Sequence, residues 1–279
     1  FYQCTGYSDA QKEYTGGWGT KFAYCFQYHN YCIFYQCNTQ TLVNGVNRGI
    51  SFYDSYECIY YQCEASCDSY SKNSNCRLWG FDNISYASLY SCKILIGKEA
   101  QPIECSGIQG FTLETSFLYH CEVFSKGYTI YTQTTIAFHL WQSRAYHCKA
   151  YDVDIGFYDE YNSEMYQCSV NINEHTSKKE TVEHIGFYKG NLYNCECNMI
   201  TVLEFLESYA TVRLHGFEDS ESYYNCNVSL SGTASATPDE RGRFYETEEF
   251  CGFYDSSGCH DPCHHIYRTK DGTTDYCNS

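Results

Sequence analysis

The sequence predicts an all-β fold made of tandem, disulfide-stapled units of about thirty residues. A tyrosine stands two residues before a cysteine ten times along the chain, where the composition would give about two such pairs by chance. In segments such as 128–136, 168–173 and 210–215, polar and apolar residues alternate or β-branched residues follow one another, which indicates strands. Helical spacing is hard to find, although the segment 199–207 leaves a short helix open as an alternative. The tyrosine–cysteine pairs are Tyr2/Cys4, Tyr35/Cys37, Tyr56/Cys58, Tyr61/Cys63, Tyr90/Cys92, Tyr119/Cys121, Tyr146/Cys148, Tyr166/Cys168, Tyr193/Cys195 and Tyr224/Cys226.

A second marker, Gly-Phe or a close variant, sets the length of the unit. Five spacings between successive phenylalanines are 29, 30, 27, 30 and 30 residues, and one step is only 19 residues. We therefore expect equivalent phenylalanines to be buried at the same position of successive units. An acidic or polar turn often follows the marker. The markers are Ser51-Phe52, Gly80-Phe81, Gly110-Phe111, Ala137-Phe138, Gly156-Phe157, Gly186-Phe187, Gly216-Phe217 and Gly252-Phe253.

The tyrosine–cysteine spacing also makes a local prediction. In a strand, residues two apart lie on the same face. The tyrosine ring is then expected to lie over the sulfur and to shield it from water and reductant.

Twenty cysteines in 279 residues indicate an oxidising compartment and at most ten bridges. We expect at least sixteen of them to be oxidised. The chain begins at Phe1 without an apolar leader, which is typical of a secreted protein whose signal peptide has been removed. All twenty are candidate disulfide cysteines: Cys4, Cys25, Cys32, Cys37, Cys58, Cys63, Cys67, Cys76, Cys92, Cys105, Cys121, Cys148, Cys168, Cys195, Cys197, Cys226, Cys251, Cys259, Cys263 and Cys277.

Cysteine density divides the chain into three zones. Residues 1–77 form cysteine-dense N-terminal modules, and residues 78–230 form the regular repeats. Several repeats carry one cysteine, which must pair between units, pair between chains or remain a thiol. We favour buried pairing between neighbouring units. The polar segment 229–242 is expected to be a linker or exposed loop, and residues 231–279 are expected to end in a disulfide knot.

Charge and composition exclude some partners. The net charge is −16 with only 18 basic residues, and no basic run could neutralise a phosphate backbone, so nucleic acid is not expected. No apolar run is long enough to span a bilayer. The sequences Asn83-Ile-Ser and Asn227-Val-Ser are glycosylation acceptors by pattern.

Two segments resemble peritrophin-type chitin-binding domains. Phe52 and an acidic turn precede a Cys-x-x-Tyr-Gln-Cys segment that ends at Cys63, and the segment 90–111 resembles the second half of that family's domain. Elsewhere the cysteine expected before Gly-Phe is missing. The resemblance implies a secreted, disulfide-stapled β fold that binds chitin through Phe52, Tyr60 and Tyr61.

One segment near the C-terminus gathers reactive groups. The segment Cys259-His-Asp-Pro-Cys-His-His is rich in zinc and copper ligands. With its cysteines bridged, His260, His264 and His265 are left as a possible metal or pH-sensitive patch. Asp152-Val-Asp154 starts like a Ca²⁺ loop but is better explained as a solvated turn. No cofactor is predicted, and no enzyme motif is found.

These features favour a secreted structural protein, a subunit of an extracellular filament, matrix or coat. Tyrosine is abundant, with 31 residues, and suits packing, sugar stacking or matrix cross-linking. The expected contact between copies sets the N-terminal zone against the C-terminal region and buries upwards of about 2,000 Å². The alternative is a repeat protein that binds chitin or a similar glycan.

Overall fold

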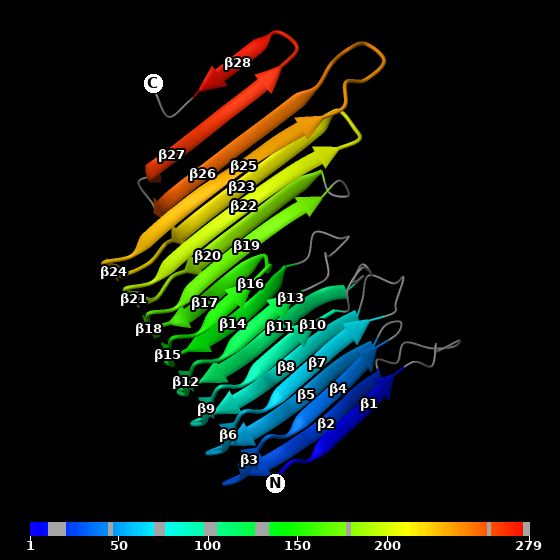
Figure 1. The fold of residues 1–279 in the computed structure, drawn as a ribbon, viewed down its shortest axis with the longest axis vertical. Coiled ribbons are helices and arrows are strands. Elements are labelled where there is room, and N and C mark those ends of the chain that lie inside the picture. Colours follow the sequence, from blue (N-terminus) through cyan, green and yellow to red (C-terminus); the bar gives the residue numbers. More distant parts are fainter. Residues whose placement is uncertain are drawn as a thin grey trace.

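The computed structural model is a β-solenoid whose coils are stacked along one long axis (Figure 1). It describes residues 1–10, 21–43, 47–69, 76–97, 105–125, 134–176, 180–255 and 258–275. All regular elements in these ranges are strands. The prediction of an all-β protein with stacked repeating units is confirmed.

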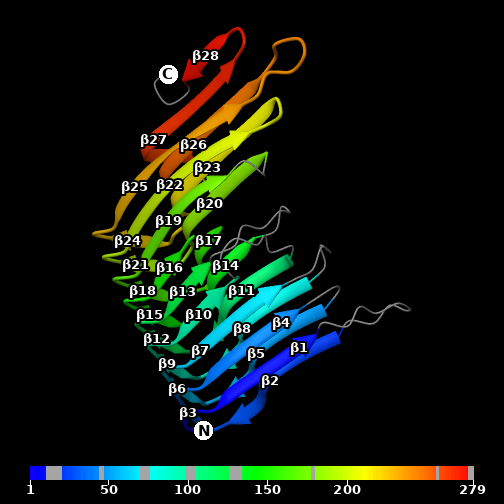
Figure 2. The same cartoon turned by 45° about the vertical axis from the view of Figure 1, so that its right-hand side comes forward.

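Three sheets run the length of the solenoid (Figures 1 and 2). Sheet 1 contains β1 (Thr5–Ala10), β4 (Asn38–Val43), β7 (Glu64–Ser69), β10 (Lys93–Ile96), β13 (Glu122–Ser125), β16 (Lys149–Tyr151), β19 (Ser169–Thr176), β22 (Glu196–Phe205) and β25 (Asn227–Ala236). Sheet 2 contains β2 (Lys21–Asn30), β5 (Asn47–Tyr56), β8 (Cys76–Ser85), β11 (Cys105–Glu114), β14 (Thr135–Trp141), β17 (Ile155–Tyr161), β20 (Thr181–Tyr188), β23 (Tyr209–Glu218), β26 (Tyr245–Asp255), β27 (Gly258–Thr269) and β28 (Gly272–Asp275). Sheet 3 contains β3 (Ile33–Tyr35), β6 (Ile59–Tyr61), β9 (Ser88–Tyr90), β12 (Phe117–Tyr119), β15 (Arg144–Tyr146), β18 (Glu164–Tyr166), β21 (Asn191–Tyr193) and β24 (Ser222–Tyr224).

Each coil, here called a rung, visits sheets 1, 2 and 3 in turn, and every strand up to β26 pairs in parallel with the strand one rung away. Tyr90, Tyr119 and Tyr146, for example, are direct partners across β9, β12 and β15. The short step of 19 residues belongs to the rung in which a tight turn at 152–154 joins β16 directly to β17. In that turn Asp152 and Asp154 each accept a backbone N–H of a neighbouring rung, at 2.8 and 2.7 Å, so this segment is a structural turn.

The Phe column fills the centre of the solenoid. Its members are Phe26, Phe52, Phe81, Phe111, Phe138, Phe157, Phe187, Phe217 and Phe253. Consecutive ring centroids are 4.4–5.2 Å apart, and the planes are nearly parallel. The members from Phe52 to Phe217 are almost fully buried. The predicted equivalence of the repeat phenylalanines is confirmed.

Glycine precedes several of these phenylalanines because the backbone of sheet 2 comes close to sheet 1 there. A Cβ added at Gly156 would lie 2.3 Å from Val170 Cγ2 and 2.6 Å from the carbonyl oxygen of Gly186. A larger residue at this position would push against both the next rung and the facing sheet.

Nine of the ten tyrosine–cysteine motifs form the corner between sheets 3 and 1, and Tyr56/Cys58 forms a corner between sheets 2 and 3. The prediction that both side chains of the motif share a face is wrong. The intervening residue has a positive φ, as at Gln36 (50°) and His147 (53°), so the chain turns between them. Tyr35 is therefore half-buried on the outside, whereas Cys37 is fully buried. The ring does not cover the sulfur of its own motif; the rest of the core does.

Two local expectations also change. The segment 199–207, left open as a helix, lies largely in β22. Residues 229–236, expected to be a linker, belong to β25 and pair in register with β22. The inward positions of β25 include Gly232 and Ala234. Because both residues are small, the sequence of this strand lacks the alternation of polar and large apolar residues that indicates a strand.

The predicted domain boundaries fall inside continuous sheets. Residue 77 lies within β8 and residue 230 within β25, and both strands pair in register with their neighbours. Separate cysteine-dense modules at the two ends are not confirmed.

The C-terminal region departs from the solenoid. β27 pairs antiparallel with β26, and β28 pairs antiparallel with β27, so this hairpin extends sheet 2 alone (Figure 1). Cys251 and Cys259 form a disulfide that ties β26 to β27, and Cys263 is also disulfide-bonded. Cys277, the fourth cysteine of the expected knot, lies outside the described residues.

In the part of the chain that the structure describes, no helix is long and apolar enough to cross a membrane.

Candidate functional site

An outward-facing Tyr column runs along sheet 3. Its members are Tyr2, Tyr35, Tyr61, Tyr90, Tyr119, Tyr146, Tyr166, Tyr193 and Tyr224. From Tyr61 to Tyr193, neighbouring ring centroids are 4.7–5.1 Å apart and the ring planes differ by 5–13°. Each ring face in this stretch is therefore covered by the next ring, and the column presents ring edges to solvent.

The residues between each tyrosine and cysteine form a polar row beside this column. The side-chain amide of Gln3 donates to Gln36 Oε1 (3.1 Å), and that of Gln36 donates to Gln62 Oε1 (2.9 Å). Further along, the rings of His120 and His147 stack at 4.8 Å. A shallow cavity of about 440 Å³ lies over the glutamines and is lined by polar side chains. The side-chain amides of the polar row hydrogen bond to one another, so the main role of the row is to fix the stacking of the rungs.

The Cys column lies inside the same corner. Its nine members are Cys4, Cys37, Cys63, Cys92, Cys121, Cys148, Cys168, Cys195 and Cys226. From Cys63 to Cys226 the thiols of successive rungs lie close enough to shift one another's pKa. Several also donate to a carbonyl of the preceding rung, as Cys195 does to Met165 at 3.4 Å. Burial raises the pKa of the Cys92 and Cys148 thiols well above the usual value.

Among the cysteines whose side chains are described, fourteen are thiols, the Cys column included. Disulfide stapling of the units is therefore not confirmed for them. Members of the column stand one rung apart, however, which places neighbouring sulfurs side by side. The sequence-based preference for pairing between neighbouring units stays a prediction.

A different set of aromatic rings, here called the edge strip, lies where sheet 2 meets sheet 3. It consists of Tyr56, Tyr86, Trp141 and Tyr161, whose exposed fractions are 40–53%. Tyr56 and Tyr86 are tilted by 58° at 5.2 Å, and Trp141 and Tyr161 by 38° at 6.3 Å. The rings of the edge strip are not stacked in parallel as the rings of the Tyr column are, so parts of their faces are open to a ligand.

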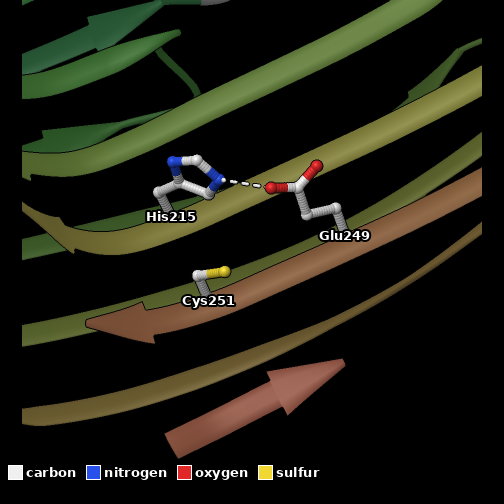
Figure 3. Close-up of side chains that lie close together, drawn as sticks. All are labelled: His215, Glu249 and Cys251. Carbon is white, nitrogen blue, oxygen red and sulfur yellow. Dashed lines mark ion pairs between the residues drawn. The ribbon is translucent and has the colours of Figure 1, made fainter. Parts of the chain in front are cut away.

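A cluster of ionisable groups lies on β23 and β26 (Figure 3). His215 is the direct strand partner of Cys251, and Glu249 lies two residues before Cys251 on the same face. Their ligand atoms are all within 4.8 Å of one another. His215 Nδ1 lies 2.8 Å from Glu218 Oε2, and Nε2 lies 3.5 Å from Glu249 Oε1. Burial lowers the pKa of His215, but the two carboxylates outweigh it and raise the pKa to about 9.

Asp82, on the outer side of sheet 2, yields a pH prediction. Burial raises the pKa of this carboxyl to about 6, although hydrogen bonds to Asn83 and Thr112 oppose the shift. The folded state thus favours the protonated form, and stability is lost as the pH rises from about 4 through 6.

Asp82→Asn should raise the free energy of unfolding at pH 7.5 by about 2 kcal/mol and leave it unchanged at pH 4. Denaturant titrations measure this, with Asp219→Asn, on the exposed side of a turn, as a control; an equal effect of Asp82→Asn at both pH values would contradict it.

The predicted glycan-binding residues are not brought together at the surface. Phe52 and Tyr60 are fully buried, because both belong to the inward rows of their sheets. Tyr61 is a member of the Tyr column, where its ring stacks on Tyr90 at 4.9 Å. The first two cannot contact a glycan.

The predicted glycosylation sites are accessible. Asn83 and Asn227 are both exposed, and the Asn83 amide donates to Asp54 Oδ1 at 2.8 Å. Their modification stays a prediction.

The predicted histidine patch is divided by strand geometry. His264 and His265 are adjacent in β27 and point to opposite faces. His264 stacks on Phe250 at 4.7 Å and contacts Glu248, whereas His265 lies opposite Glu249. His260 is in β27, but its side chain lies outside the described part of the structure. A shared metal site of these three residues does not form; His265 instead lies beside the His215 cluster.

Sequence patterns missed the His215 cluster because His215 is 34 residues from Glu249 and 36 from Cys251 and meets them only through strand pairing. Arg213-Leu-His-Gly-Phe carried the useful signal, since a histidine directly before the Gly-Phe marker occupies a fixed position in the rung.

No protein-family model, curated protein or solved structure matches this chain.

Proposed function

We propose that this chain is a secreted structural protein, a stiff subunit of an extracellular filament, matrix or coat. The observation that carries the proposal is the Tyr column. Its rings lie on the outside, where a binding protein would offer ring faces to a ligand, yet from Tyr61 to Tyr193 they cover one another. The tyrosine rings at this surface therefore hold successive rungs together along the axis of the solenoid.

The rest of the body supports the same role. The Phe column, the Tyr column and the Cys column run in parallel through successive rungs, so neighbouring rungs are held at three positions at once. Repeat proteins of this kind gain stability from nearest-neighbour contacts, and a long array resists bending because each rung is fixed by both neighbours.

The contact between copies is proposed at the strand edges near the C-terminal region. Among the described strands, β24 and β25 are the last of sheets 3 and 1, and edge strands offer unpaired backbone groups to another chain. The β27–β28 hairpin already occupies the next positions of sheet 2. A head-to-tail contact with the N-terminal zone would therefore use sheets 1 and 3. Because the net charge is −16, salt should favour it by screening repulsion.

The edge strip supports glycan binding as a second candidate function. Its four rings expose 40–53% of their surface and are tilted, so sugars could stack on them.

A pull-down on insoluble chitin and cellulose separates the two proposals. The structural role predicts that wild-type protein stays in the supernatant. Glycan binding predicts retention that falls at least about tenfold in a Trp141→Ala/Tyr161→Ala double variant, since each stacking contact contributes on the order of 1 kcal/mol. A matched Ile200→Ala variant, which removes an exposed apolar side chain of β22, should retain binding in that case. Strong retention lost only in the double variant would overturn the structural proposal.

A further inference from the structure

We propose that His215, Glu249 and Cys251 form a Zn²⁺ site that becomes available when the Cys251–Cys259 disulfide is reduced. In the bridged protein Cys251 is bound to Cys259, and a disulfide sulfur is a poor metal ligand. The metal and the bridge are then alternative ways of fastening the C-terminal hairpin region to the last rungs.

The donor set fits zinc. Imidazole, carboxylate and thiolate are the ligands that Zn²⁺ takes in proteins, usually four in a tetrahedron. The three donor atoms lie within 4.8 Å of one another, close enough for small side-chain movements to bring them around one ion. They come from β23 and β26, whose pairing fixes the two strands side by side (Figure 3). His265 faces Glu249 across β26 and β27 and is placed to supply the fourth ligand.

The histidine is oriented as a metal ligand. His215 is only 7% exposed, and its buried Nε2 makes no hydrogen bond but lies 3.5 Å from Glu249 Oε1, on the side of the ring where an ion would bind. Its other ring nitrogen, Nδ1, is held 2.8 Å from Glu218 Oε2. A carboxylate on the far nitrogen is the usual support of a zinc-bound histidine, because it fixes the ring and makes Nε2 a better donor. Tyr254 stacks on the ring at 4.9 Å and fixes its plane.

The redox step is a two-electron reduction. A thiol or phosphine reductant breaks the S–S bond and supplies two electrons, solvent supplies two protons, and Cys251 and Cys259 become thiols. When Cys251 Sγ and His215 Nε2 bond the metal, each gives up its proton to solvent.

The test uses Co²⁺ as a spectroscopic probe for the zinc site. Cys259→Ser removes the bridge and leaves Cys251 as a thiol without any reductant. This variant should bind one equivalent of Co²⁺ beyond that of the oxidised wild type, with thiolate-to-cobalt charge transfer and the intense visible bands of a tetrahedral ion. Both proteins carry the same Cys column, so Co²⁺ that binds to the column is measured in the wild type and can be subtracted.

Further variants in the Cys259→Ser background locate the ion. Cys251→Ser should abolish the charge-transfer band, and Glu218→Ala should weaken Co²⁺ binding about 10- to 100-fold through loss of support to His215. His175→Ala is the matched control: His175 also lies 3.5 Å from a glutamate, Glu204, but is exposed on β19 far from the cluster along the chain, and its loss should change nothing.

Two results would overturn the proposal. One is the absence of a thiolate–cobalt band in folded Cys259→Ser, with folding checked by circular dichroism. The other is a band that survives in Cys251→Ser/Cys259→Ser. Wild-type protein reduced by a phosphine provides a second route to the same site, and its thiolate–cobalt band should exceed that of reduced Cys251→Ser by one equivalent of Co²⁺.

Discussion

Phe138→Ala should lower the free energy of unfolding by about 3–5 kcal/mol, the cost expected for deleting a fully buried phenylalanine. The Phe138 ring is stacked between Phe111 at 5.1 Å and Phe157 at 4.5 Å, with both pairs of planes within 6° of parallel. Its loss opens a cavity in the centre of the solenoid and removes two stacking contacts at once. Denaturant unfolding followed by circular dichroism measures the change.

The matched control for Phe138→Ala is Phe117→Ala. Phe117 is 37% exposed on the outer face of β12 and has Arg144 near its ring. Its replacement should cost less than about 1 kcal/mol. Equal effects of the two substitutions would contradict the account of a continuous aromatic core.

The Cys column makes a second prediction, about how many thiols remain in the native protein. Neighbouring strands lie about 4.8 Å apart, within the Cα spacing of about 4.4–6.8 Å that a disulfide accepts, so adjacent members can be bridged in an oxidising compartment. Nine members give four bridges and one thiol. Cys32 with Cys58, whose Sγ accepts the Cys32 N–H at 3.4 Å, and Cys76 with its strand partner Cys105 give two more.

Adding the Cys251–Cys259 bridge and the bridge of Cys263 gives sixteen oxidised cysteines and four thiols. Cys67 and Cys197 are expected among the thiols. Burial raises the pKa of Cys67 to about 12, which makes it slow to react. Alkylation under denaturing conditions followed by mass spectrometry counts the thiols, and six or more would contradict an oxidised structural role.

Two substitutions test pairing between neighbours by parity. Cys121→Ala divides the column into four members on each side, so all pair and the total falls to about three thiols. Cys92→Ala divides it into three and five, so two members stay unpaired and the total rises to about five. Equal counts in the two variants would exclude pairing restricted to adjacent rungs.

The repeat could be predicted from the sequence because each rung must place the same residue types at the same corners. Gly-Phe recurs because sheets 1 and 2 approach closely there, and Tyr-x-Cys recurs because the corner separates an outer ring from an inner sulfur. The pattern therefore identified strands, period and core phenylalanines. It did not reveal the positive φ of the middle residue, since glutamine, serine, histidine and asparagine all occupy that position.

The parts that depend on pairing between distant strands could not be predicted. A unit of thirty residues fits many small independent modules as well as one solenoid, because only the in-register stacking of whole rungs distinguishes them. The glycan residues were misplaced for the same reason: Phe52 and Tyr60 lie in a motif of exposed aromatics in the resembling family, but here they belong to inward rows. The His215 cluster forms only because β23 pairs with β26.

Sedimentation of the purified native protein over a range of concentration and salt, with negative-stain imaging of the same samples, tests the proposed structural role most directly. We expect filaments or large assemblies that increase with ionic strength, because a net charge of −16 must be screened before copies meet. Each contact should bury upwards of about 2,000 Å². A monodisperse monomer at high concentration and at every salt concentration would contradict the structural role.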